Sequence, residues 1–107
     1  MSTRTEAAEY FWDMVEPLFA EDGIEEGSLM GFPCLRLDGA FFATCDHRTG
    51  DLIVKLPADR VGELIDSGAG TPFSPAGKVF KEWVLVDNRD AALWLGLLDE
   101  AKAFARA

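Results

Sequence analysis

The sequence has few of the residue types that covalent cross-links and metal centres require. Its 107 residues include two cysteines and one histidine. Two cysteines are too few for the disulfide framework of a small secreted domain. Together with a single histidine they also fall short of a closed four-ligand zinc site, unless a carboxylate joins them. We therefore expect neither a disulfide scaffold nor a zinc domain.

Basic residues and long apolar runs are scarce as well. Ten Lys and Arg stand against 19 Asp and Glu, a formal charge of −9, whereas nucleic-acid binding relies on clustered cations. The longest apolar run, at 91–98, is far short of the roughly 20 residues that cross a bilayer. Carboxylates interrupt residues 1–9, where a signal peptide would be apolar. These features predict a cytoplasmic protein that binds neither nucleic acid nor membranes.

The remaining composition is that of one folded domain. Hydrophobic residues make up 49% of the chain and charged residues 27%, which is typical of a globular protein. The sequence shows no repeat and no linker. We expect a single domain over residues 1–107.

Helical spacing dominates the start of the chain. Residues 3–6 (Thr-Arg-Thr-Glu) fit a capping box, and Pro17 is expected to kink or end the helix that follows. Residues 21–27 are interpreted as an acidic loop. The apolar stripe of the predicted helix comprises Ala8, Phe11, Val15 and Leu18.

A period of two replaces helical spacing from residue 28 to residue 56. Apolar runs at 29–37 and 40–45 flank Asp38-Gly39, a strong hairpin signal because both turn residues tolerate positive φ. A second connection at 47–50 leads into a strand at 51–56. Three strands in an antiparallel meander are expected.

A two-residue turn would pair Leu35 with Phe42 and Cys34 with Ala43, and side-chain alternation then sorts the sheet into two faces. The first face is apolar and is expected to lie under helices; it carries Leu35, Leu37, Phe42, Leu52, Val54 and Leu56. The second face is mixed and carries Cys34, Arg36, Phe41, Ala43, Cys45, Ile53 and Lys55.

The second half of the sequence predicts a short helix from Pro57 to Gly68, followed by a loop over 69–77. A fourth strand over 81–87 and a C-terminal helix capped at Asp87 or Asn88 are expected after this loop. The predicted fold class is α+β, in the order α-β-β-β-α-β-α: a three-strand meander plus a fourth strand in an antiparallel sheet, packed by N-terminal, middle and C-terminal helices. The apolar stripe of the last helix comprises Ala91, Trp94, Leu95, Leu98, Ala101 and Ala105.

Several segments in this order resemble the TfoX N-terminal domain family, which is related to the MmcQ/YjbR group. The resemblance implies a secretion-chaperone-like α+β fold. The family's named member regulates competence genes, but the resemblance supports a fold more than a function, and it transfers no catalytic residue and no cofactor. The segments that carry it are Met30-Gly31-Phe32-Pro33-Cys34, residues 38–43 (Asp-Gly-Ala-Phe-Phe-Ala), residues 52–57 (Leu-Ile-Val-Lys-Leu-Pro) with Arg60, and residues 71–84, which begin Thr-Pro-Phe-Ser-Pro.

Possible reactive groups have simpler interpretations. Cys34 and Cys45 are expected diagonally on one face, about 7–8 Å apart, beyond the roughly 6.8 Å limit for disulfides, so we expect two free thiols. His47 near Cys45 is interpreted as a solvated loop residue rather than part of a catalytic pair. The loop at 69–72 lacks the features of a phosphate-binding loop. The cluster Glu21, Asp22, Glu25 and Glu26 is interpreted as a solvated turn rather than a cation site.

Two functions from different classes remain, and neither is catalytic. The leading hypothesis is a non-enzymatic interaction or regulatory module that binds a protein or a second copy through the mixed face or a strand edge; its candidate residues are Phe32, Cys34, Arg36, Phe41, Ile53 and Lys55. A stacking platform for single-stranded nucleic acid on the same face is less favoured, because only two cations stand on it. The alternative is a small-ligand pocket between the loop at 71–77 and the sheet, lined by Arg60, Phe73, Lys81 and Trp83.

Overall fold

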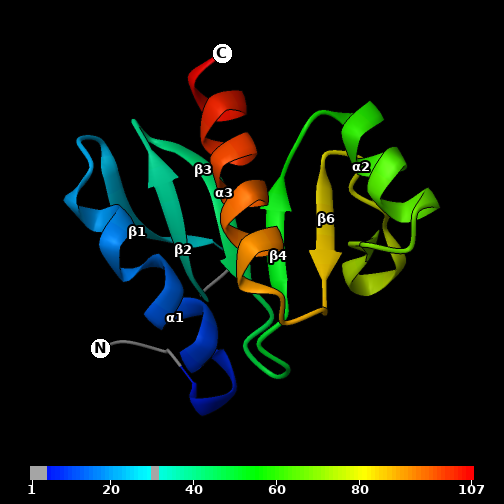
Figure 1. The fold of residues 1–107 in the computed structure, drawn as a ribbon, viewed down its shortest axis with the longest axis horizontal. Helices are drawn as coiled ribbons and strands as arrows, with labels where there is room; N and C mark the ends of the chain where they lie inside the picture. Colours follow the sequence, from blue (N-terminus) through cyan, green and yellow to red (C-terminus); the bar gives the residue numbers. More distant parts are fainter. Residues whose placement is uncertain (1–4, 30–31) are drawn as a thin grey trace.

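The computed structural model describes residues 5–29 and 32–107. Over these residues the chain forms one antiparallel sheet of six strands, in the order β1-β2-β3-β4-β6-β5, together with three α-helices (Figure 1). The α+β prediction is confirmed, but the sheet has two more strands than the four expected. Thr3, which would open the predicted capping box, lies outside the described residues.

Pro17 ends the first α-helix, as expected. A 3-10 turn at Glu6–Ala8 leads into α1 (Glu9–Val15), and a second 3-10 segment, Glu16–Ala20, contains the proline near its start. Proline removes an amide donor and its ring crowds the preceding turn, so the regular i to i−4 ladder stops there. The buried side of this region contributes Ala8, Phe11, Trp12 and Val15 to the core.

The acidic loop predicted at 21–27 is wrong in its second half. Residues Ile24–Leu29 form β1, an edge strand that pairs antiparallel with β2 (Phe32–Leu37). Ile24 is buried, whereas Glu25 and Glu26 are exposed. A buried isoleucine followed by two exposed carboxylates lacks the alternation by which strands are recognised, so the composition indicated a loop.

The hairpin at Asp38-Gly39 is confirmed. Both residues have positive φ, 51° and 88°, and the turn joins β2 to β3 (Ala40–Cys45). Arg36 pairs with Phe41 as predicted, but the register then shifts, so Leu35 lies opposite Ala43. The predicted pair of Leu35 with Phe42 is therefore wrong, and so is the pair of Cys34 with Ala43, because a β-bulge places one extra residue in β3.

The bulge changes which face the rest of β3 presents. Beyond it, Ala43 lies opposite Val54 and Cys45 opposite Leu52 of β4 (Leu52–Lys55), so both belong to the buried core. Placing Ala43 on the mixed face was an error of one residue in register, and Thr44, opposite Ile53, takes its place there. Cys45 packs in the core but also borders the hollow on the other face.

The second half of the chain follows the expected order with two additions. Helix α2 (Ala58–Asp66) ends before Gly68, which has a φ of 81°. The predicted loop contains the two-residue strand β5 (Thr71–Pro72) and the 3-10 turn Pro75–Gly77. β6 (Trp83–Val86) pairs with both β4 and β5.

Helix α3 (Ala91–Arg106) is capped by Asp90, whose side chain accepts a hydrogen bond from the Leu93 amide at 3.1 Å. The predicted cap at Asp87 or Asn88 is therefore wrong by two or more residues. Leu95 also departs from the prediction, because it is exposed while Leu97 is buried. Trp94, at the centre of the stripe, is fully buried and packs edge-on against Tyr10.

The helices lie on one side of the sheet. Helix α3 contacts β2, β3 and β4, and α2 contacts β5 and β6; Figure 1 shows α1 and α3 side by side across the same face. The other side, which we call the open face, carries Phe41, Thr44, Ile53, Lys55 and Trp83. No helix among residues 5–29 and 32–107 is long and apolar enough to cross a membrane.

Candidate functional site

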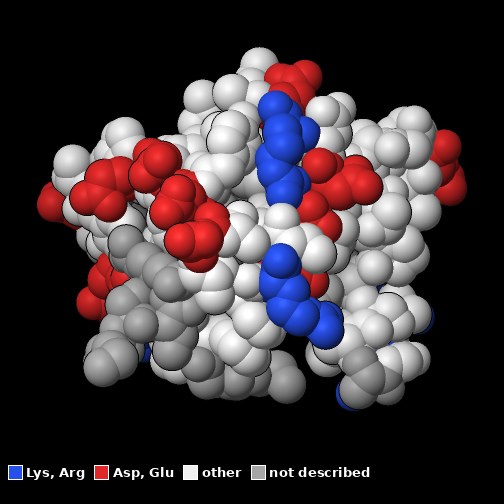
Figure 2. Space-filling model, turned by 90° about the horizontal axis from the view of Figure 1, so that it is seen from below, with Lys and Arg blue, Asp and Glu red and all other residues white. Residues whose placement is uncertain are grey.

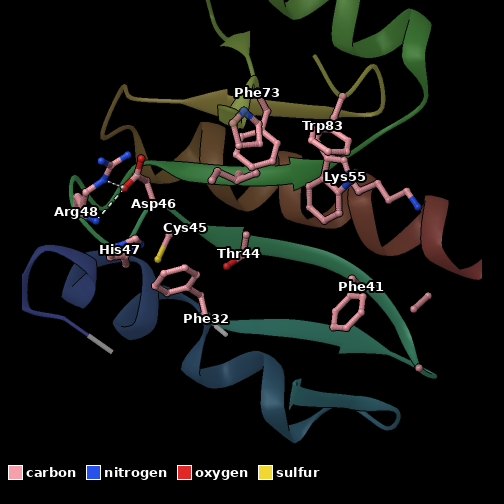
Figure 3. A pocket seen from close by; sticks show the side chains of 15 residues that line it. Phe32, Phe41, Thr44, Cys45, Asp46, His47, Arg48, Lys55, Phe73 and Trp83 are labelled. Carbon is pink, nitrogen blue, oxygen red and sulfur yellow. Dashed lines mark hydrogen bonds and ion pairs between the residues drawn. The ribbon is translucent and has the colours of Figure 1, made fainter. Parts of the chain in front are cut away.

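The open face contains a hollow of about 590 Å³, which we call the aromatic pocket (Figure 3). Pockets for small ligands typically measure roughly 300 to 1,000 Å³ and are lined mainly by apolar and aromatic groups. Five aromatic side chains line this one: Phe32, Phe41, Phe73, Phe80 and Trp83. Both its size and its lining are those of a ligand site.

The floor of the pocket comes from the middle strands. Thr44 lies opposite Ile53 and Lys55 lies opposite Trp83, and directly opposed residues of an antiparallel pair point to the same face. The Thr44 hydroxyl donates a hydrogen bond of 2.9 Å to the Pro33 carbonyl. The bulge in β3 therefore contributes to the pocket, because without it residue 44 would face the core.

The segment between β5 and β6 forms one wall. The Phe80 amide donates a hydrogen bond of 3.0 Å to the Phe73 carbonyl, which closes this segment into a loop. The Phe73 ring centroid lies 5.8 Å from that of Phe80 and 6.5 Å from that of Trp83. Aromatic pairs at such spacing attract one another, so the wall is a packed cluster rather than an isolated ring.

Phe32 and His47 form the opposite end. Their rings are stacked, with centroids 4.1 Å apart and planes inclined by 14°. Phe32 is 41% exposed, which is unusual for so large an apolar side chain. In Figure 3 both rings lie across the pocket from Phe73. The apolar lining thus continues from β2 to the 73–80 loop.

The charge of the lining is opposite to that of the chain. Lys55 and Arg48 line the pocket with one carboxylate, Asp46. Arg48 lies 3.8 Å from Asp46, and its amide also donates to that carboxylate at 2.8 Å. Among the described residues, Lys55 has no carboxylate within ion-pair distance. The pocket therefore presents a cation in a chain of formal charge −9.

A second hollow of about 460 Å³ adjoins the first. It is lined by Lys55, Phe80 and Trp83, which it shares with the aromatic pocket, and by Ala58, Lys81 and Glu82. Its lining contains two lysines and one glutamate, a net positive charge. We call it the lysine hollow.

The structure brings the two predicted residue sets together in one site. Phe32, Phe41, Ile53 and Lys55, proposed for an interaction surface, line the aromatic pocket beside Phe73 and Trp83, proposed for a ligand pocket. Lys81 lines the lysine hollow. Sequence reasoning missed Thr44, His47 and Phe80. The recurrence of aromatic residues at 73, 80 and 83 was the available signal for Phe80.

Three predicted residues lie elsewhere. Arg60 bonds Glu100 of α3 at 2.8 and 3.1 Å, on the helical side of the sheet, so placing it in the pocket was wrong. Cys34 is buried and is absent from the pocket lining. Arg36 flanks the site, 3.2 Å from Glu25 and with its guanidinium 5.9 Å from the Phe41 ring.

Both cysteines are free and buried. The expectation of free thiols is confirmed, but the predicted diagonal placement of the two cysteines is not, since the bulge brings Cys45 into the core cluster, where it also borders the aromatic pocket. Burial raises the pKa of Cys34 to about 11 and the pKa of Cys45 to about 12. A thiolate is the nucleophilic form, so neither sulfur is poised for attack at neutral pH.

The carboxylates predicted as a solvated turn are partly engaged by cations. Glu21 accepts hydrogen bonds of 3.0 and 3.1 Å from Lys102, and Glu25 pairs with Arg36. Burial disfavours the charge on Lys102, but Glu21 and Asp99 outweigh it and raise the pKa of its ammonium group. Within residues 5–29 and 32–107, no group of three or more His, Cys, Asp or Glu side chains could hold a metal ion.

The charged side chains are unevenly distributed over the surface. Seen from below in Figure 2, basic side chains form a narrow column through the middle of the view, with acidic side chains on both sides of it. Glu9, Asp13 and Glu16, in and just after α1, are all exposed. Some of the excess acidic side chains therefore lie on the helical layer, on the side of the sheet opposite the pocket.

Comparison with family models, curated proteins and solved structures gives no match. The resemblance to the TfoX N-terminal domain family therefore stays a prediction, and function must be argued from the geometry of the site.

Proposed function

We propose that this domain binds a small, mainly apolar ligand in the aromatic pocket. The observation that carries the proposal is an aromatic-lined hollow of about 590 Å³ on the sheet face opposite the packed helices. Aromatic rings gain free energy by burying apolar area and by stacking on flat groups. A ligand with a ring system or a short hydrocarbon body would make both kinds of contact.

The rigidity of the site also supports ligand binding. Its floor consists of hydrogen-bonded strands, and its wall is closed by the Phe80–Phe73 hydrogen bond. A preformed site loses little conformational freedom when a ligand enters, so more of the contact energy remains as affinity. Thr44 on the floor and His47 at one end supply polar atoms, which is the usual means of orienting a ligand in an apolar pocket.

The test uses the neutral fluorophore N-phenyl-1-naphthylamine, whose emission rises in apolar surroundings. The parent chain is expected to bind it saturably. Thr44→Trp fills the floor of the pocket and is expected to weaken binding at least tenfold. Thr71→Trp is the matched control, since Thr71 is exposed on β5 and outside the pocket lining.

Two outcomes would overturn the proposal. One is a parent chain that does not bind the probe; the other is a Thr44→Trp variant that binds it as the parent does. Circular dichroism and the melting temperature of both variants show whether the substitution has disturbed the fold, because Thr44→Trp also removes the hydrogen bond to Pro33.

Association with a second copy through the same face is the second candidate function. The observation that favours it is the 41% exposure of Phe32, because a second copy would bury this ring and an interface core is rich in aromatics. Phe41→Glu would then abolish a dimer while the fold persists. A parent chain that sediments as a monomer at all concentrations would exclude this candidate.

A further inference from the structure

We propose that the ligand is an anion, with its apolar body in the aromatic pocket and its charged group between Lys55 and Lys81 in the lysine hollow. The inference rests on the proposed function and adds the chemical class and orientation of the ligand. A carboxylate, phosphate or sulfonate on a ring system or hydrocarbon chain meets this description.

The two hollows share a boundary. Lys55, Phe80 and Trp83 line both of them, so a ligand that leaves the aromatic pocket past Trp83 enters the lysine hollow. Lys55 is the cross-strand partner of Trp83, and both side chains stand on the open face. The Lys55 ammonium is therefore available at the place where an apolar body would end.

Main-chain bonding fixes the second lysine beside the first. The amide of Leu56 donates a hydrogen bond of 2.9 Å to the carbonyl of Glu82. This bond holds the segment before β6 against the end of β4, and Lys81 lies in that segment. Two lysines far apart in sequence therefore line one hollow.

The charges in the lysine hollow are not balanced. Among the described residues, neither Lys55 nor Lys81 has a carboxylate within ion-pair distance, and Glu82 is the one acid in the lining. By contrast, four other described cations have carboxylate partners: Arg36, Arg60, Arg89 and Lys102. Lysine ammonium groups bind carboxylate and phosphate as point charges, so this hollow is complementary to an anion.

The first residue of α2, Ala58, also lines the lysine hollow. The cap of this helix, Pro57, makes no side-chain hydrogen bond to its first turn. The amino end of a helix carries a partial positive charge, which adds to the field of the two lysines. The proposal itself rests on the lysines and the hollow they share.

The experiment compares two probes that share one aromatic body. 1-Anilinonaphthalene-8-sulfonate carries a sulfonate, and N-phenyl-1-naphthylamine lacks it. Lys55→Met and Lys81→Met are each expected to weaken binding of the sulfonate about three- to fivefold, the upper end of the range of a solvent-exposed ion pair. Binding of the neutral probe to Lys81→Met should stay within about twofold, since Lys81 lines only the lysine hollow and the aromatic contacts of the pocket are kept.

Lys78→Met is the matched control. It removes the same charge, but Lys78 lies over the Phe80 ring at 5.6 Å and lines neither hollow. If Lys78→Met weakens sulfonate binding as much as the other two variants do, the effect is that of net charge and the proposal is wrong. It is also wrong if Lys55→Met and Lys81→Met leave sulfonate binding unchanged.

Competition separates the possible anions. Dodecanoate and dodecyl phosphate are expected to displace the sulfonate probe at lower concentration than the neutral dodecanol, and their order shows which head group fits. Equal displacement by all three would contradict an anion site. Failure of the neutral probe to bind the parent would overturn the proposed function, whereas its binding without any effect of the lysine variants would overturn only the present inference.

Discussion

Gly50 lies directly against the main chain of Ala7, and a Cβ atom at residue 50 would overlap the Ala7 carbonyl oxygen. Gly50 also has a φ of 82°. Its amide donates a hydrogen bond of 2.7 Å to the Asp46 carbonyl, and the guanidinium of Arg89 donates to the neighbouring Thr49 carbonyl at 2.7 Å. The β3–β4 turn is thus the place where the N-terminal segment and the start of α3 meet.

Gly50→Ala is expected to destabilise the fold far more than Gly39→Ala. Both glycines have positive φ, which costs an alanine about 1 kcal/mol. Only Gly50 adds a steric clash, since a Cβ at Gly39 meets nothing within 4 Å; overpacking adds roughly 1 to 3 kcal/mol. Urea denaturation of the two variants measures the difference, and equal losses would show that the N-terminal segment moves away without cost.

The buried thiols predict a loss of stability at alkaline pH. In the unfolded chain the thiols ionise near their ordinary pKa of 9.0, whereas burial raises the pKa of Cys34 to about 11 and that of Cys45 to about 12. Above pH 9 the unfolded state therefore releases protons that the folded state retains. The free energy of unfolding should fall by up to about 1.4 kcal/mol per pH unit for each thiol.

Cys34→Ala and Cys45→Ala are the controls for that prediction. Each variant should show a shallower decline between pH 9 and pH 11 than the parent, whatever its stability at neutral pH. If both variants lose stability as steeply as the parent, the loss of stability is due to other groups.

The free thiols can also be counted directly. In the absence of reductant, two thiols should react with a thiol reagent after denaturation.

Arg60 is expected to stabilise the fold without affecting the ligand site. It joins α2 to α3 through two hydrogen bonds to Glu100. The pair is partly exposed, at 37% and 42% of the side chains, so its coupling energy should be about 1 kcal/mol or less. A double-mutant cycle of Arg60→Met and Glu100→Gln measures it. Weaker binding of N-phenyl-1-naphthylamine to Arg60→Met would contradict the placement of Arg60 on the helical side.

Substitutions at two phenylalanines are expected to have opposite effects on stability and on ligand binding. Phe42 is fully buried in the core, and Phe32 is 41% exposed at the pocket. Phe42→Ala should cost about 3 to 5 kcal/mol of stability. Phe32→Ala should cost less than about 1 kcal/mol yet weaken binding of the neutral probe several-fold. Unchanged probe binding in Phe32→Ala would remove this residue, and its stack on His47, from the site.

Local chemistry made parts of the fold predictable. Asp38-Gly39 permits positive φ at both turn positions, and Pro17 stops an α-helix, whatever the rest of the chain does. The bulge in β3 depends instead on how β2 and β3 pair in the folded sheet, and β1 depends on an edge that only the folded sheet provides. Neither leaves a periodic signal in the sequence.

The candidate site was predicted in two halves for the same reason. Phe41 and Ile53 share a face through strand alternation, and Phe73 and Trp83 were grouped because they flank one loop. These two groups of residues form one site because β4 pairs with β6, which brings together segments that α2 separates in the sequence. Arg60 was misplaced because its partner Glu100 lies 40 residues away in α3, and the sequence alone did not indicate that α2 packs beside α3.

The two edges of the sheet restrict how copies of this chain could add to one another. β1 presents the adjacent carboxylates Glu25 and Glu26, one toward each face, and β5 is two residues long and ends in Pro72, which has no amide to donate. Charge on one edge and proline on the other are the devices by which sheets resist further strand pairing. Growth into filaments is therefore blocked at both ends, and the domain can expose an apolar hollow on its face without becoming a template for aggregation.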